Sequence, residues 1–110
     1  MRLPNADHSI VEIIKLTGYC LNPIHPRGRH KARVFYSSLG FDQKNAEMLK
    51  TLLLKAARES DAVAVEKDEF GQRYVIDFHI AGPKGTATTR SSWIILNGEV
   101  VPRFVSCYVL

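Results

Sequence analysis

The densest group of potentially reactive side chains lies in segment 22–33, which reads NPIHPRGRHKAR. Pro23 and Pro26 disfavour a helix and Gly28 permits a sharp turn, so we expect a rigid loop leading into a helix that begins near Arg29. A helix start exposes unpaired backbone N–H groups and carries partial positive charge. Basic side chains surround this start, namely Arg27, Arg29, His30, Lys31 and Arg33. The segment therefore suits a phosphate or another anion.

The charge of this segment has no local compensation. Between Glu12 and Asp42 the chain contains no acidic residue. The formal net charge of +4 agrees with a polyanionic partner but does not require one, because an exposed basic turn can simply be solvated. A histidine inside the cluster adds a group that can transfer protons near neutral pH, which an ordinary basic turn lacks.

Three helices are expected in the first half of the chain, which at 110 residues fits one domain, residues 1–110. Apolar residues recur with mostly helical spacing over 10–21, although Gly18 weakens that pattern. A second helix should follow the basic loop and end at Gly40. Asp42 is a good N-cap for a third helix over 42–59, whose apolar stripe is the most regular of the three.

The second half of the chain has the texture of an antiparallel sheet, with short β-branched and aromatic runs separated by turn residues. The predicted strands are Ala62–Lys67, Arg73–Ile80, Thr86–Leu96 and Arg103–Leu110. The expected fold class is α+β, with three N-terminal helices packed on one face of a four-stranded antiparallel sheet.

Alternate residues of a strand point to opposite faces, so the pattern also predicts what each face carries. The core face should hold Tyr74, Ile76, Phe78, Ile80, Trp93, Ile95, Val105, Cys107 and Val109. The open face should hold Arg73, Asp77, His79, Thr88, Arg90, Ser92, Ser106 and Tyr108. A solvated sheet face is polar in any case. Here, however, the polar groups are mostly donors with one carboxylate, which favours an anion-binding surface.

Several other kinds of site are not supported by the sequence. The four histidines show no metal-ligand spacing, and the segment around Gly28 lacks the spacing of a nucleotide-binding loop. Cys20 and Cys107 form no CxxC pair and have no flanking charge, which predicts buried free thiols in a reducing cytoplasm. We therefore expect no metal and no cofactor. No signal-like or membrane-length apolar run is present, so a soluble cytoplasmic protein with no membrane partner is expected.

The residues also resemble a bacterial domain family of unknown function, DUF6883. The matching segments are Leu3-Pro4-Asn5-Ala6, 19–23 (YCLNP), 25–28 (HPRG), 30–32 (HKA), 71–74 (GQRY), Asp77-Phe78, Arg90-Ser91, Trp93-Ile94, Pro102-Arg103 and 107–110 (CYVL). The resemblance covers nearly the whole chain.

The resemblance implies a toxin-like protein, either encoded beside a small antitoxin-like protein or forming the C-terminal module of a larger toxin. The order of helices followed by four strands is similar to that of the barnase, EndoU and RelE class of metal-independent ribonucleases. Family positions that match without assigned roles are His30, Lys31, Arg73, Arg90, Arg103 and Tyr108. His79 stands where the family has no histidine, which argues against its being a catalyst.

The leading hypothesis is a metal-independent endoribonuclease toxin that cleaves RNA by attack of the ribose 2′-OH on the adjacent phosphate. This chemistry needs proton transfer and stabilisation of the charge on the phosphate. The candidates are His30 and Tyr108 for proton transfer, Arg73 and Arg90 for charge stabilisation, and Arg27, Arg29, Lys31, Arg33, Ser92 and Arg103 for binding substrate. The alternative is a module that binds RNA or an acidic protein without chemistry, since both functions use the same donors. Less favoured is a toxin that acts on another anion, such as a nucleotide.

Overall fold

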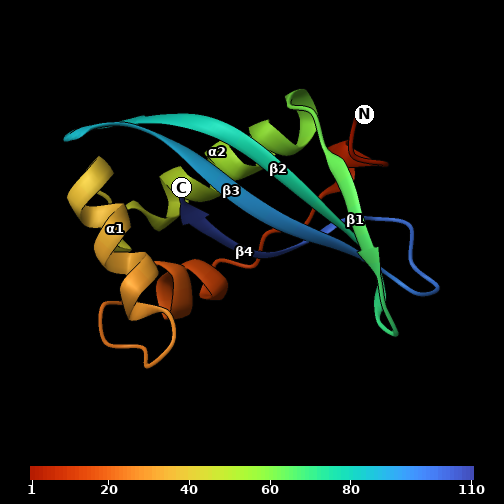
Figure 1. Ribbon diagram of the computed structural model, residues 1–110, viewed down its shortest axis with the longest axis horizontal. Helices are drawn as coiled ribbons and strands as arrows, with labels where there is room; N and C mark the ends of the chain where they lie inside the picture. Colours follow the sequence, from red (N-terminus) through yellow and green to blue (C-terminus); the bar gives the residue numbers. More distant parts are fainter.

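A computed structural model covers residues 1–110 and shows an α+β fold built on a four-stranded antiparallel sheet in the order β1-β2-β3-β4 (Figure 1). The strands are β1 (Val63–Lys67), β2 (Gly71–Gly82), β3 (Gly85–Leu96) and β4 (Arg103–Val109). The sheet is therefore the meander that the turn signals predicted. β2 and β3 are longer than expected and pair over their full length, from Gly71 opposite Leu96 to Gly82 opposite Gly85.

Two α-helices precede the sheet, α1 (Arg29–Leu39) and α2 (Ala46–Glu59). Gly40 ends α1 with φ of 76°, in the left-handed region that glycine tolerates. Asp42 accepts a hydrogen bond from the Lys44 backbone and forms a capping box with Asn45, which starts the short 3₁₀ turn η3 (Gln43–Asn45) before α2. The helix expected to begin near Arg29 and end at Gly40 is thus confirmed, whereas the helix expected over 42–59 becomes α-helical only at Ala46, because Asp42 caps the 3₁₀ turn that precedes it.

The helix predicted over 10–21 forms over residues 14–20 but not at its start. Residues 14–15 are helical and lead into the π-helical turn η2 (Leu16–Cys20), and the 3₁₀ turn η1 (Ala6–His8) lies earlier in the chain. The Ile10 backbone instead pairs with the start of β4, because Ile10 N–H donates to Pro102 and Phe104 N–H donates to Ile10. This pairing across the chain satisfies the backbone groups that a helix would have used.

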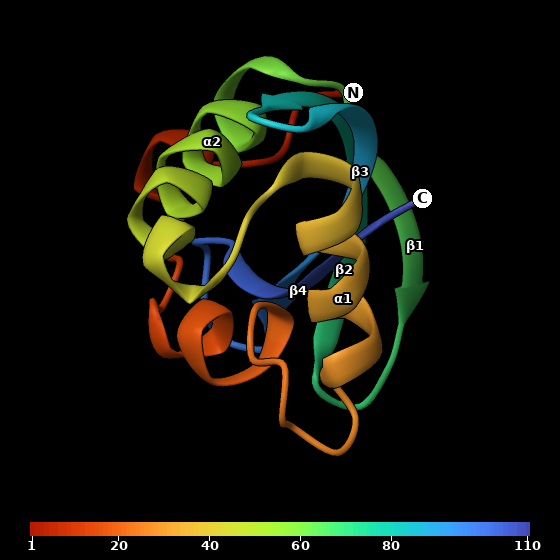
Figure 2. The same cartoon turned by 90° about the vertical axis from the view of Figure 1, so that its left-hand side faces the viewer.

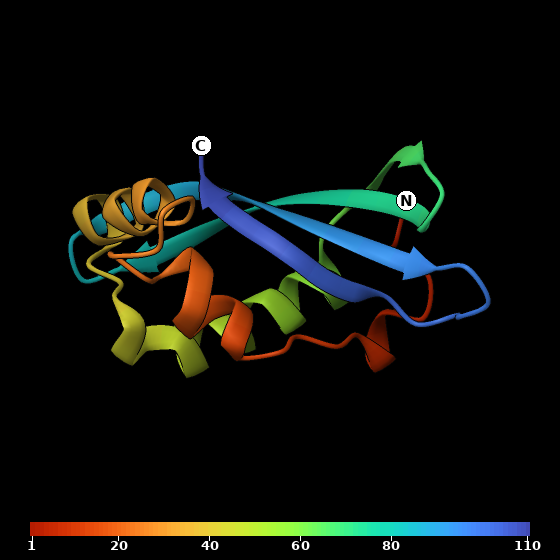
Figure 3. The ribbon, with the colours of Figure 1, turned by 90° about the horizontal axis from the view of Figure 1, so that it is seen from below.

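α2 and α1 hold different positions against the sheet. α2 and η2 lie below the sheet in Figure 3, whereas α1 lies close to the level of the sheet, beside the end where β2 turns into β3. The same end-on placement of α1 is visible in Figure 2. Lys84 N–H in the β2–β3 turn donates a hydrogen bond to the carbonyl of Leu39 at the end of α1. This bond links the end of the helix to the turn. The expectation that all helices cover one face is therefore only partly right.

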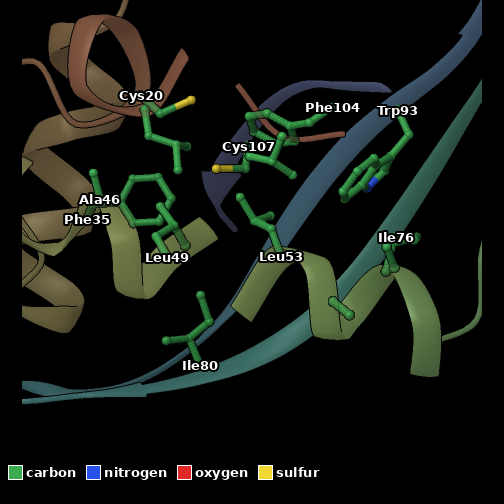
Figure 4. Close-up of a cluster of buried hydrophobic side chains, with 14 of the residues drawn as sticks. Cys20, Phe35, Ala46, Leu49, Leu53, Ile76, Ile80, Trp93, Phe104 and Cys107 are labelled. Carbon is green, nitrogen blue, oxygen red and sulfur yellow. The ribbon is translucent and has the colours of Figure 1, made fainter. Parts of the chain in front are cut away.

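One core joins these elements. Leu49 and Leu53 of α2 pack with Ile76, Trp93 and residues of α1, all of them buried (Figure 4). The predicted core face holds for Tyr74, Ile76, Ile80, Trp93 and Cys107, while Phe78, Ile95 and Val109 are partly buried at its margin.

Val105 does not occupy the core position that was predicted for it. A β-bulge between β3 and β4 places Trp93 opposite Phe104, while Ser92 still pairs with Ser106. Phe104 therefore takes the buried position, and its ring meets Trp93 edge-to-face at 5.5 Å between centroids. An extra residue of this kind shifts the alternation of the strand, which sequence parity alone does not reveal.

Candidate functional site

The basic segment reaches the sheet through one lysine. Lys31 extends from the first turn of α1, and its Nζ lies 3.1 Å from Ser106 Oγ on β4 and 3.4 Å from the hydroxyl of Tyr19 on η2. The same Nζ lies 4.9 Å from the centre of the Tyr19 ring and 5.6 Å from that of Tyr108. Two aromatic rings and two hydroxyls thus surround this ammonium group, which has no carboxylate partner.

Ser106 lines two shallow hollows, and its hydrogen bond with Lys31 connects it to a third. The third is lined by His30, Lys31 and Tyr108 and has a volume of about 290 Å³. Of the two that Ser106 lines, one, about 280 Å³, is lined on the sheet by Arg73, Ser92 and Ser106, and the other, about 300 Å³, by Tyr19 and Ser106. We call this region the Ser106 junction, defined by Tyr19, His30, Lys31, Ser92, Ser106 and Tyr108.

A row of polar side chains on the open face extends the junction across the sheet. Asp77, Arg90 and Tyr108 are opposite one another on β2, β3 and β4. Arg90 donates two hydrogen bonds to the Asp77 carboxylate, from Nε to Oδ1 at 2.8 Å and from Nη2 to Oδ2 at 2.9 Å. The Asp77 carboxylate, and to a smaller extent the Tyr108 hydroxyl, raise the pKa of Arg90, while Arg90 lowers the pKa of Asp77. Arg90 is thus a fixed cation opposite Tyr108 on the neighbouring strand.

The other two sheet arginines are also paired with carboxylates. Arg73 donates to Asp68 at 2.6 Å, and Arg103 donates to Glu99 at 2.9 Å. Arg73 lines one of the hollows of the Ser106 junction, but Arg103 lines none of the three. Asp68 and Glu99 belong to the turns between strands, so the open face carries more negative charge around its arginines than strand parity indicated.

The remaining predicted binding residues lie apart from the junction. Arg29 and Arg33 line a different hollow on the other side of α1, and exposed Arg27 lies in the loop before it. His25 organises that loop, because its Nδ1 accepts hydrogen bonds of 3.0 Å from the backbone N–H groups of Arg27 and Gly28. Gly28 packs so closely on the Tyr19 carbonyl that a Cβ would lie 2.3 Å from that oxygen.

Two buried thiols lie under the junction. Cys20 Sγ is 3.7 Å from Ser106 Oγ, and Cys20 and Cys107 are both free and buried, as predicted (Figure 4). Contact with Cys107, helped by Ser106 and Lys31, lowers the pKa of Cys20 to about 6 although burial opposes this. Contact with Cys20 and burial raise the pKa of Cys107. Because both are inaccessible to a substrate, their effect on the site is through packing.

Sequence reasoning missed Tyr19 and did not single out Ser106 as a site residue. Ser106 was placed on the open face by parity, and Tyr19 belongs to the YCLNP segment of the family resemblance. Their meeting with Lys31 depends on η2 and α1 packing together beside β4, which no local pattern reports. His30, Lys31 and Tyr108, by contrast, line one hollow as the hypothesis requires.

Neither a metal centre nor a membrane span is evident. No three His, Cys, Asp or Glu side chains converge as ligands for a metal ion. None of the helices has the length and apolar character needed to cross a membrane.

Comparisons with known proteins give a structural relative and a family. A chain from a complex of a contact-dependent growth inhibition toxin with its immunity protein, from Klebsiella pneumoniae 342, superposes with a TM-score of 0.68 and 16% sequence identity. The match covers 92% of this chain and 99% of that one, which shows a shared fold. No curated protein matches significantly in sequence. Residues 2–110 match a family described as a domain of unknown function, DUF6883, and the chain therefore belongs to that family.

Proposed function

We propose that the protein is an endoribonuclease toxin that cuts RNA at the Ser106 junction by attack of the 2′-OH on the adjacent phosphate. The observation that carries the proposal is the environment of Lys31, an ammonium group without a carboxylate partner, held between Tyr19, Ser106 and Tyr108. A positioned cation of this kind can stabilise the charge that builds on a phosphate during the reaction.

The neighbouring side chains supply the other parts that the reaction needs. Exposed His30 shares a hollow with Lys31 and Tyr108, so imidazole and phenol are the candidates for removing the 2′-OH proton and protonating the departing 5′-oxygen. Arg90 lies opposite Tyr108 on the neighbouring strand and places a positive charge beside the site. Ser92, opposite Ser106, adds a hydroxyl that can bind ribose or phosphate.

The three sheet arginines differ in how well they suit the substrate roles predicted for them from the sequence. Arg73 lies beside the junction, yet its bond to Asp68 uses part of the donor capacity needed by a phosphate. Arg103 is bound to Glu99 and fits a structural role better than substrate binding. The charge that acts on the phosphate is therefore assigned chiefly to Lys31, with Arg90 positioning Tyr108.

The fold shared with a chain from a toxin–immunity complex supports a toxin role and a small protein partner. The helices-then-sheet order supports placement in the RelE and barnase class. An RNA substrate implies action in a cytoplasm, where RNA is available.

A second function has one observation in its favour. Because Arg73, Arg90 and Arg103 are all paired with carboxylates, few free cations remain on the open face to stabilise a transition state, whereas unpaired Arg29 and Arg33 on α1 suit binding without chemistry. A module that binds RNA or an acidic protein without cleavage is the alternative.

Incubation of the purified protein with total RNA in EDTA distinguishes the two. The proposed reaction predicts fragments ending in a 2′,3′-cyclic phosphate, and no cutting of an oligonucleotide whose scissile nucleotide is 2′-deoxy. Intact RNA, a requirement for a divalent metal, or cleavage of the 2′-deoxy substrate would contradict the mechanism. RNA that is bound and remains intact would favour the alternative.

A further inference from the structure

The largest hollow of the molecule is not part of the Ser106 junction. It has a volume of about 520 Å³ and lies between the outer side of α1, the loop before it and the connection to α2. Leu21, Phe41 and Tyr36 contribute its apolar lining, and Arg29, Arg33 and Lys44 contribute basic groups. We call it the α1 groove.

The basic groups of the α1 groove are free to meet a partner. None of Arg29, Arg33 and Lys44 has a carboxylate within ion-pairing distance, unlike the three arginines of the sheet. All three side chains are exposed. The one acidic residue of the lining, Asp42, is engaged as the cap of the η3 turn, where its Oδ1 accepts from Lys44 N–H at 2.8 Å. With three cations and one carboxylate, the groove therefore presents net positive charge to an anionic ligand.

α1 separates the groove from the proposed site of cleavage. Arg29, Arg33 and Tyr36 line the groove, whereas His30, Lys31 and Val34 line the hollow next to Tyr108. A ligand in the groove therefore contacts a different side of the helix from an RNA at the junction.

The lining favours a protein ligand over a nucleic acid. Tyr36 is half exposed, but Lys84 Nζ lies 3.8 Å from its ring centre and covers one face of the ring that a base would otherwise stack on. Pro23 and Tyr36 are the exposed apolar residues of the lining, above a floor of buried Leu21, Ala32 and Phe41, and they provide contacts for aliphatic or aromatic side chains. Apolar contacts bordered by cations match an amphipathic segment with acidic residues beside its apolar face.

We propose that the α1 groove is a docking site for an acidic amphipathic segment of a partner protein. Its apolar side chains would lie against Pro23 and Tyr36, and its carboxylates against Arg29, Arg33 and Lys44. Charge complementarity of this kind selects the partner and speeds association. The inference does not depend on ribonuclease activity, because it uses neither His30 nor Lys31.

The test uses a defined probe, a fluorescent helical peptide of about 18 residues with Leu on one face and Glu on the other, a length that gives about five turns. A scrambled peptide of the same composition and a single-stranded RNA oligonucleotide are the comparison ligands. Binding is followed by anisotropy and by amide chemical shifts at about 0.15 M salt, where exposed long-range attraction is screened. The Arg29→Glu/Arg33→Glu variant is compared with Lys55→Glu/Arg58→Glu, which makes the same charge change on exposed residues of α2.

We expect the amphipathic peptide to bind more tightly than the scrambled one and to shift the amides of Arg33, Tyr36 and Lys44. The α1 variant should lose about tenfold or more in affinity while the α2 variant retains it, because like charges facing each other oppose binding. Thermal melts identify any variant that fails to fold. The Lys44→Glu variant then tests the third cation of the α1 groove independently. Equal binding of both peptides, equal losses in both charge variants, or groove shifts caused by RNA instead of the peptide would overturn the proposal.

Discussion

The cations of α1 and the cations of the sheet differ in how they are neutralised. Arg29, Lys31 and Arg33 have no carboxylate partner, and no acidic residue occurs between Glu12 and Asp42. Each of the sheet arginines, Arg73, Arg90 and Arg103, is bound to a carboxylate. The number of arginines on a surface is therefore a poor guide to its anion affinity, because pairing decides how many donors remain available.

The two regions should consequently respond differently to substitution. Changes on the junction side of α1 should affect RNA chemistry and binding, whereas changes at the paired arginines should chiefly affect local structure. Four variants test this division, in order of expected effect.

His30→Ala should reduce RNA cleavage most, by about 10²–10⁴-fold, because a positioned acid or base usually contributes that much to the rate. Folding and RNA affinity should stay nearly unchanged, since His30 is exposed. Cleavage rates under single-turnover conditions measure the effect. His79→Ala is the matched control, as His79 is also exposed but contacts only Thr88 on the sheet. Equal rates for wild type and His30→Ala would remove the imidazole from the mechanism.

Leu53→Ala should lower the free energy of unfolding by about 2–5 kcal/mol, the usual cost of a cavity at a buried leucine. Leu53 belongs to the core cluster that contains Ile76 of β2 and Phe35 of α1, so both regions depend on this packing. Urea denaturation with matched slopes measures the loss. Leu54→Ala, at a partly buried position of the same helix, should cost less. An unchanged midpoint for Leu53→Ala would contradict the packing of α2 under the sheet.

Lys31→Ala should weaken RNA binding and reduce by about one the slope of log affinity against log salt, the change expected for one lost phosphate contact. Arg103→Ala should leave that slope unchanged, because its guanidinium is already bound to Glu99. Titrations at several salt concentrations compare the two variants. The distinction between free and paired cations fails if Arg103→Ala alters the slope as much as Lys31→Ala does.

Asp77→Asn should have the smallest effect, a small loss of stability at neutral pH that disappears in acid. Arg90 holds the pKa of Asp77 below its ordinary value of 3.8, so the carboxylate stabilises the fold above that pH. This contribution is lost as the pH falls through the lower pKa of the folded state. Wild type should therefore lose more stability than Asp77→Asn between about pH 5 and pH 2 in thermal melts. Parallel curves for the two proteins would show that the ion pair adds no stability at neutral pH.

The parts of the fold that sequence predicted correctly are those with strong local signals. Gly40 and Asp42 marked helix ends through their backbone and capping preferences, and the turn residues separated the four strands. The start of the helix expected over 10–21 is missing because Ile10 pairs with the start of β4, a contact distant in sequence. Val105 failed because the bulge is a property of the β3–β4 pair and not of β4 alone.

For the candidate site, the identity of several residues was predicted better than their positions relative to one another. His30, Lys31 and Tyr108 were named from their chemistry and from the family resemblance, and they do line one hollow. Arg29 and Arg33 were assigned to the same surface because they are adjacent in sequence, but the helical turn carries them to the other side of α1. The pairing of Arg73 and Arg103 depends on how turn carboxylates fold back, which strand parity does not describe.

The most direct test of the account is to locate RNA on the protein. A 2′-O-methyl oligonucleotide, which lacks the nucleophile, can be titrated into ¹⁵N-labelled protein while amide chemical shifts are recorded. We predict shifts concentrated at Lys31, Arg90, Ser106 and Tyr108, where the free lysine meets the sheet. Shifts confined to the Glu99–Arg103 turn, or to the α1 groove around Arg33 and Lys44, would contradict the assignment of the Ser106 junction as the RNA site.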